Sequence, residues 1–141
     1  MKTVLACASL FMFVAFAADD SDRAKLTGSW QDNGTVWVIE DKGATLHLTR
    51  SEGSQKVAEF ECNVAGRECE GKDSGHKATV SMWFNGAALV QMETKGSEVV
   101  KRHFEITPQG DIMELQTVLI TPAGPTEKVQ FKRVATAVSS R

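Results

Sequence analysis

The stretch HKATVSMWFNGAALVQMETKGSEVVKRHFEIT, residues 76–107, decides the fold that the sequence predicts. It contains three runs in which apolar and polar side chains alternate, which is the pattern of β-strands with one buried face. The runs are separated only by Asn85-Gly86-Ala87 and Gly96-Ser97-Glu98, and glycine permits the tight reversal of a hairpin. Strands joined by such short turns pair antiparallel with their immediate neighbours, so this stretch predicts a β-meander.

The same pattern continues on both sides of this stretch, with roughly one strand every ten residues. No segment shows a sustained helical period of apolar residues. A meander of this length must either close on itself or pack as two sheets, and closure removes the exposed edges that invite aggregation. We therefore expect an all-β fold, an antiparallel up-and-down meander of about eight strands that forms a barrel or a strongly curved sheet. The further predicted strands are 35–40, 44–50, 56–62, 112–120 and 128–134.

The N-terminus carries the pattern of a cleaved secretory signal. Lys2 is followed by an apolar run from Val4 to Phe16, and Ala15-Phe16-Ala17 offers a small residue on each side of Phe16. The run is shorter than the roughly 20 residues of a membrane-spanning helix. A buried or membrane-anchoring helix is the alternative. The pattern favours a secreted or periplasmic protein with no membrane attachment after cleavage.

The chain divides into four predicted segments. A signal peptide and a polar, flexible arm precede one domain, and a frayed tail follows it. A single domain is what a chain of 141 residues would be expected to form. The segments are 1–17 for the signal, 18–25 for the flexible arm, 26–134 for a single β domain, and 135–141 for the frayed tail.

Two cysteines, Cys62 and Cys69, remain after removal of the signal. An even number in an oxidising compartment favours a disulfide, and Gly66 would let the short loop between them turn back. Free thiols are an alternative. A metal site would require a Cys-x-x-Cys spacing and further ligands, so we expect none.

Charge and motifs exclude several classes of function. The net charge of −2 lacks the clustered Lys and Arg that phosphate contacts require, so nucleic acid is not expected as a partner. The chain has no Gly-x-Ser-x-Gly, His-Glu-x-x-His or glycine-rich phosphate loop, and its three histidines are scattered. We therefore expect neither an enzyme nor a cofactor.

Gly28 and Trp30 lie in KLTGSWQ, and this Gly-x-Trp resembles the first strand of lipocalin-type barrels. The chain resembles small bacterial secreted lipocalin-like domains of unknown function more specifically, through residues 77–98 and 99–116. The resemblance implies a barrel whose closed end is plugged by Trp30, with a late basic residue, here Arg133, covering the indole ring. A guanidinium over an indole contributes about 0.5–2 kcal/mol, and Gly28 would allow a close crossing of the chain.

Four residues are candidates for ligand binding. Arg102 alternates with apolar neighbours, so it would line an interior and meet an acidic ligand group; an arginine at the rim with its head in water is the alternative. Trp83 shares a face with small polar residues, and Trp37 lies on a strand with two apolar faces. Such mixed faces suit a ligand-facing lumen, a partner surface or a second small core. Met92 completes the candidate set as a further apolar lining residue.

These observations favour a secreted or periplasmic barrel that binds a small apolar molecule. The alternative is a protein–protein interaction module such as a secreted protease inhibitor, a class that the chain loosely resembles. In that class an N-terminal arm enters the active site of the target, and here the arm would be residues 18–25.

Overall fold

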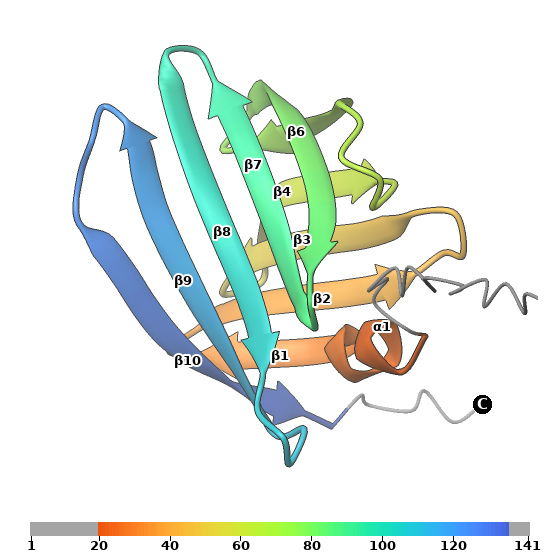
Figure 1. Cartoon of the computed structure of the whole chain (residues 1–141). Helices are drawn as coiled ribbons and strands as arrows, with labels where there is room; N and C mark the ends of the chain where they lie inside the picture. Colours follow the sequence, from red (N-terminus) through yellow and green to blue (C-terminus); the bar gives the residue numbers. More distant parts are fainter. Residues whose placement is uncertain (1–19, 136–141) are drawn as a thin grey trace, which may run out of the picture.

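The computed structural model describes residues 20–135, so the predicted signal peptide and residues 136–141 of the tail lie outside the described residues. Within this range the chain forms one short helix and ten strands (Figure 1). In chain order these elements are α1 Asp20–Leu26, β1 Gly28–Asp32, β2 Thr35–Asp41, β3 Leu46–Glu52, β4 Gln55–Cys62, β5 Cys69–Asp73, β6 His76–Asn85, β7 Ala88–Lys95, β8 Glu98–Ile106, β9 Ile112–Thr121 and β10 Thr126–Val134.

Every strand pairs antiparallel with its neighbours in sequence, and β1 also pairs with β10, which closes the barrel. The predicted all-β meander is therefore confirmed, with ten strands in place of about eight. The unexpected strand is β5, whose sequence Cys-Glu-Gly-Lys-Asp carries no alternation of large apolar side chains. β1 is the first strand that the Gly-x-Trp resemblance implied.

The barrel has two different ends. Because successive strands run in opposite directions, the turns after β2, β4, β6 and β8 share one end with α1, which packs against β2 and β8. Figure 1 shows α1 lying beside the ends of β1 and β2 at this closed end. The turns after β1, β3, β5, β7 and β9 gather at the opposite end, which we call the far end.

The apolar core fills the half of the barrel next to the closed end. Side chains at every second strand position point inward, and those near the closed end are almost all apolar. Burying such side chains supplies the main driving force for folding, at about 25 cal/mol for each Å² of apolar area removed from water. The largest fully buried members are Leu26, Trp30, Trp37, Ile39, Leu46, Leu48, Phe60, Met82, Leu89, Phe104 and Met113.

Trp30 and Arg133 close this end together. The Arg133 Cζ atom lies 4.2 Å from the centre of the Trp30 ring, as the family resemblance implied. The guanidinium also donates hydrogen bonds to the carbonyl oxygens of Lys25 at 2.8 Å, Thr27 at 2.9 Å and Gly110 at 3.0 Å. Gly28 has a φ of 140°, and a Cβ there would lie 2.6 Å from Arg133 Nη1. The absence of a side chain at position 28 therefore leaves the space that the Arg133 guanidinium group occupies.

The described part of the expected flexible arm, residues 20–25, belongs to helix α1. Arg23 anchors the helix by donating from Nη2 to Asp41 Oδ1 at 2.8 Å and to the Gly43 carbonyl at 2.8 Å. Leu26 is fully buried, and its carbonyl accepts a hydrogen bond from Trp30 Nε1 at 2.9 Å. The sequence showed no helical period because seven residues span only about two turns.

The predicted disulfide between Cys62 and Cys69 is confirmed, with a Cα–Cα distance of 5.7 Å. It joins the end of β4 to the start of β5 and encloses a loop at the closed end of the barrel. Among the described residues, no helix has the length and apolar character needed to cross a bilayer.

Candidate functional site

The structure separates the four candidate residues into two pairs. Trp37 and Arg102 lie inside the barrel, 1% and 7% exposed. Trp83 and Met92 lie on the outer surface, because their neighbours along the chain, Met82 and Gln91, are fully buried and strand side chains alternate. The four candidates therefore do not share one site, and the interior pair defines the candidate site.

Arg102 belongs to a group of four buried polar side chains and the half-buried Arg50, which together we call the interior cluster. It consists of Arg50, Asp73, Gln91, Glu93 and Arg102, contributed by β3, β5, β7 and β8. Arg102 Nη1 donates to Gln91 Oε1 at 3.0 Å and to Glu93 Oε1 at 3.1 Å. Asp73 joins the two arginines, with Oδ1 at 3.0 Å from Arg50 Nη2 and Oδ2 at 3.7 Å from Arg102 Nη2.

Trp37 forms a base beneath the two guanidinium groups. The centre of its ring lies 5.5 Å from Arg50 Cζ and 5.7 Å from Arg102 Cζ. On the side of the core, Phe104 meets the same indole edge to face, with ring centres 5.2 Å apart. Trp37 is therefore in contact with both the charged cluster and the apolar core.

The interior cluster lies on the far-end side of the core. Asp73 is the last residue of β5, and Arg50 and Glu93 both lie in the last few residues of strands that run toward the far end. The apolar side chains of the core lie between the cluster and α1. A molecule with a polar head and an apolar body would meet matching surfaces along this axis.

The two carboxyl groups of the cluster differ in their ionisation. Burial raises the pKa of Glu93, and although the Arg102 charge lowers it, Asp73 raises it again, so the pKa lies above its usual value. Burial also raises the pKa of Asp73, but its contacts with Glu93, Arg50, Ser74 and Arg102 outweigh burial and hold that pKa below its usual value. Asp73 is therefore the stronger acid of the two, and Glu93 is the carboxyl that takes up a proton more readily.

Two buried polar atoms of the cluster have no hydrogen-bond partner, Gln91 Nε2 and Glu93 Oε2. Gln91 is 0% exposed and Glu93 is 2% exposed. A buried polar atom left unpaired costs about 1–3 kcal/mol, which a bound polar group would recover. The amide offers a donor, and a protonated Glu93 offers a second.

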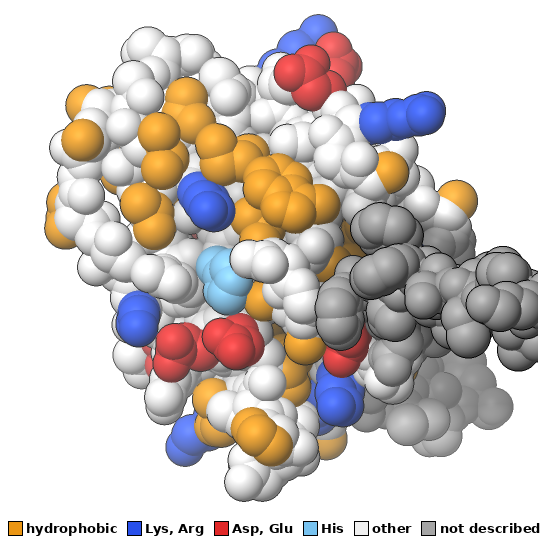
Figure 2. All heavy atoms as spheres, in the orientation of Figure 1, with side chains coloured by type: hydrophobic (Ala, Val, Ile, Leu, Met, Phe, Trp, Pro, Cys, Tyr) orange, Lys and Arg blue, Asp and Glu red, His pale blue; other side chains and the backbone are white. Residues whose placement is uncertain are grey.

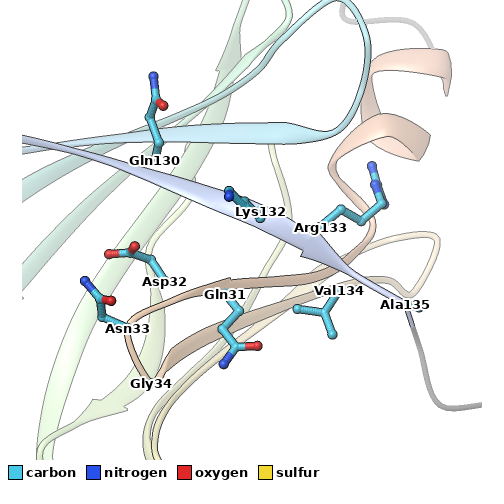
Figure 3. Close-up of a pocket in the computed structure, with 9 residues that line it drawn as sticks. All are labelled: Gln31, Asp32, Asn33, Gly34, Gln130, Lys132, Arg133, Val134 and Ala135. Atoms are coloured by element: carbon cyan, nitrogen blue, oxygen red, sulfur yellow. The ribbon is translucent and has the colours of Figure 1, made fainter.

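A separate hollow of about 550 Å³ lies on the outer surface, where the β1–β2 hairpin meets β10. Figure 3 shows that its polar side chains point in different directions and that Arg133 turns away from it, toward α1. It is lined by Gln31, Asp32, Asn33, Gly34, Gln130, Lys132, Arg133, Val134 and Ala135. Nothing here converges on a ligand, so the interior cluster is the stronger candidate site.

Four members of the cluster were not predicted from the sequence: Arg50, Asp73, Gln91 and Glu93. In β7 the residues Ala88, Val90 and Met92 form the more apolar face, which favours the wrong side as the interior. The inner face of β7 could have been inferred from β8. Arg102 pairs directly with Gln91 in the β7–β8 ladder, so the two side chains lie on the same face of the sheet. In the described part of the chain, no group of three or more His, Cys, Asp or Glu side chains is arranged to hold a metal.

No family model matches the chain, and no curated protein matches it. Two solved structures share its architecture. One is a "secretary abundant heat soluble (SAHS) protein" from Ramazzottius varieornatus, with a TM-score of 0.65, 14% identity, and coverage of 78% of this chain and 96% of that chain. The other is "REP1-NXSQ fatty acid transporter", with a TM-score of 0.64, 15% identity, and coverage of 79% and 98%. The fold is a lipocalin-like barrel.

Proposed function

We propose that this protein binds a small amphiphilic molecule with an anionic head inside the barrel. The head would lie against Arg102 and Arg50, and the apolar body would extend along the Trp37 ring and the core side chains. The sequence favoured a small apolar ligand, and this proposal restricts the class of ligand to apolar molecules that carry an acidic group. The barrel has ten strands, and even eight strands enclose enough interior to hold one small ligand in lipocalins.

The observation that carries the proposal is the uncompensated charge of the interior cluster. Arg50 and Arg102 contribute two positive charges and Asp73 contributes one negative charge, so one positive charge is left whenever Glu93, whose pKa is raised by burial, holds its proton. A buried unpaired charge is costly. An anionic head would neutralise it and would find donors at Gln91 Nε2 and Arg102.

The likeness to known structures is compatible with this proposal. The second neighbour is a fatty acid transporter by its title, and a fatty acid is an amphiphile with one carboxylate. We also propose that the protein acts outside the cytoplasm. The Cys62–Cys69 disulfide supports this location because disulfides persist in oxidising compartments.

We further propose binding without catalysis. The carboxyl and guanidinium groups of the interior cluster are engaged in ion pairs and hydrogen bonds with each other, an arrangement that suits holding a ligand head group. The protease-inhibitor alternative requires a free N-terminal arm. Most of that segment is helix α1, which Arg23 fastens to Asp41, so the structure offers it no support.

The test measures binding of a long-chain fatty carboxylate and of its methyl ester by titration calorimetry. We expect the wild-type protein to bind the carboxylate at least tenfold more tightly, about 1.4 kcal/mol, because only the carboxylate pairs with Arg102. Arg102→Gln should abolish this preference, whereas Arg102→Lys should retain part of it. Equal affinity of the wild-type protein for carboxylate and ester would contradict the proposal.

Lys101→Gln is the matched control. It removes one positive charge from the adjacent position of β8, but its side chain lies on the outer face. The preference for the carboxylate should therefore be unchanged in this variant. Circular dichroism and thermal unfolding of each variant would separate a lost contact from a lost fold.

A further inference from the structure

The outer surface of β6–β9 carries an apolar face that the interior site does not use. Trp83, Val90 and His103 are direct cross-strand neighbours in one row, and Met92, Lys101 and Val118 form the next row. Figure 2 shows hydrophobic side chains gathered over these strands around a basic side chain and a histidine, with acidic side chains nearer the closed end. Further apolar side chains of this face are Val99 and Ile120, of which Ile120 is 43% exposed.

The charges on this face are arranged along β8 in a fixed order. Lys101, His103 and Glu105 follow one another on the outward side, with Lys101 nearer the far end. Lys101 and Glu105 are separated by four residues of strand, roughly 13 Å at 3.3 Å per residue, which is too far for an ion pair within the chain. Glu105 is also the direct cross-strand neighbour of Glu114, and like charges in that position destabilise a sheet. Lys128 on β10, 4.0 Å from Glu114 and exposed, offsets this repulsion only in part.

We propose that this face is the interface of a symmetric homodimer. A twofold axis across β8 at His103 would lay the strands of the two copies antiparallel, the aligned arrangement in which two sheets commonly pack. Lys101 would then lie opposite Glu105 of the partner subunit, and Glu105 opposite Lys101 of the partner subunit. Each lysine would also approach Glu114 of the partner subunit and relieve the carboxylate repulsion.

Charge complementarity favours a second copy of this chain, in this orientation, as the partner that covers the apolar face. An axis parallel to the strands would set Lys101 against Lys101 of the partner subunit and Glu105 against Glu105 of the partner subunit, which is repulsive. A negatively charged lipid surface would gain from Lys101 but would be repelled by Glu105 and Glu114. In the antiparallel arrangement the pattern matches itself, as an isologous interface requires. This proposal is independent of the interior site.

The test is a charge-exchange series followed by sedimentation velocity over a range of protein concentrations. The wild-type protein should form a concentration-dependent dimer. Lys101→Glu and Glu105→Lys should each raise the dimer dissociation constant at least tenfold, because each places like charges opposite one another. The double variant Lys101→Glu/Glu105→Lys should restore the wild-type constant.

Lys72→Glu, an exposed charge change on β5, is the matched control and should leave the dimer unchanged. His103→Cys gives a covalent test. Because position 103 would lie at the twofold axis, the cysteines of the two subunits would face each other and should form a disulfide-linked dimer on mild oxidation, whereas Lys72→Cys should not. At about 200 µM, a dimer with a tight interface of standard size would be almost completely formed. A wild-type protein that stays monomeric at this concentration would therefore overturn the proposal. Failure of the double variant to restore association would overturn it as well.

Discussion

At the scale of single residues, filling the interior of a barrel with the charged side chains of the interior cluster costs more free energy than filling it with apolar side chains. Replacing a buried ion pair by well-packed apolar side chains is often neutral or stabilising. Here two arginines, an aspartate, a glutamate and a glutamine occupy positions where neighbouring strands place leucine, methionine or phenylalanine. Two of their polar atoms remain unpaired. A cluster that lowers stability and leaves open hydrogen-bonding groups is better explained by recognition of a ligand than by folding.

The ionisation of Glu93 leads to a prediction about pH. Below its raised pKa, Glu93 is neutral and the cluster carries one positive charge; above it, Glu93 is ionised and pairs with Arg102, so the cluster is neutral. We therefore expect anion affinity to fall as pH rises through this pKa, by about tenfold for one charge at an effective dielectric constant near 20. The measurement is titration of a long-chain alkyl sulfonate, which stays ionised, between about pH 5 and pH 9.

Glu93→Gln mimics the neutral form and should flatten this pH profile. His47→Gln is the control, because it also removes an ionisable side chain, but one that lies on the outer side of β3, with Nδ1 3.3 Å from Glu40 Oε1. An affinity that rises with pH, or a profile that the Glu93 variant leaves unchanged, would show that Glu93 does not control the head-group site.

At the scale of the elements, strands with one apolar face could be read from the sequence, and strands with two mixed faces could not. In β6 the residues Ala78, Val80 and Met82 alternate with mostly polar residues, and the structure places this more uniformly apolar face inside the barrel. In β7 the apolar residues lie on the outer face, over which the proposed interface extends. β5 and α1 were missed because each is short and is held by contacts distant in sequence, such as the disulfide and the pair of Arg23 with Asp41.

The link between β4 and β5 gives a prediction at this scale. Replacing Cys62 and Cys69 together by alanine opens a loop whose ends are seven residues apart. By the chain-entropy relation, loss of a crosslink around such a short loop should lower the free energy of unfolding by about 2–3 kcal/mol. Urea denaturation of the double variant, compared with wild type in oxidising and in reducing buffer, measures this difference.

The free energy of unfolding of wild-type protein in reducing buffer should equal that of the double variant in oxidising buffer within error, since both lack the crosslink. The interior cluster should be affected little, because Asp73 lies at the other end of β5 from Cys69. A double variant as stable as oxidised wild type would mean that β5 is held by its ladder hydrogen bonds alone.

At the scale of the whole molecule, stability depends on joining the two ends of the chain. The β1–β10 ladder contains only three registered pairs, centred on Trp30 with Arg133. Without this ladder, β1 and β10 would both become exposed edges. The Arg133 side chain reinforces the closure from outside the ladder, since it bonds to carbonyls that precede β1 and to the turn between β8 and β9. One residue therefore connects the first, middle and last parts of the barrel.

Arg133→Ala should accordingly destabilise the whole barrel and not only its C-terminal strand. We expect a loss of about 1–2 kcal/mol, because the indole loses its cation and three carbonyls return to water, while the exposure of Arg133 limits the effect. Lys132→Ala on the same strand is the control and should change the unfolding free energy by less than about 0.5 kcal/mol. In hydrogen exchange, the slowest amides of β3 and β8 should lose as much protection as those of β10, because a closed barrel unfolds as one unit. Loss of protection confined to β1 and β10 would instead mean that the seam opens locally and that the rest of the barrel is stable without it.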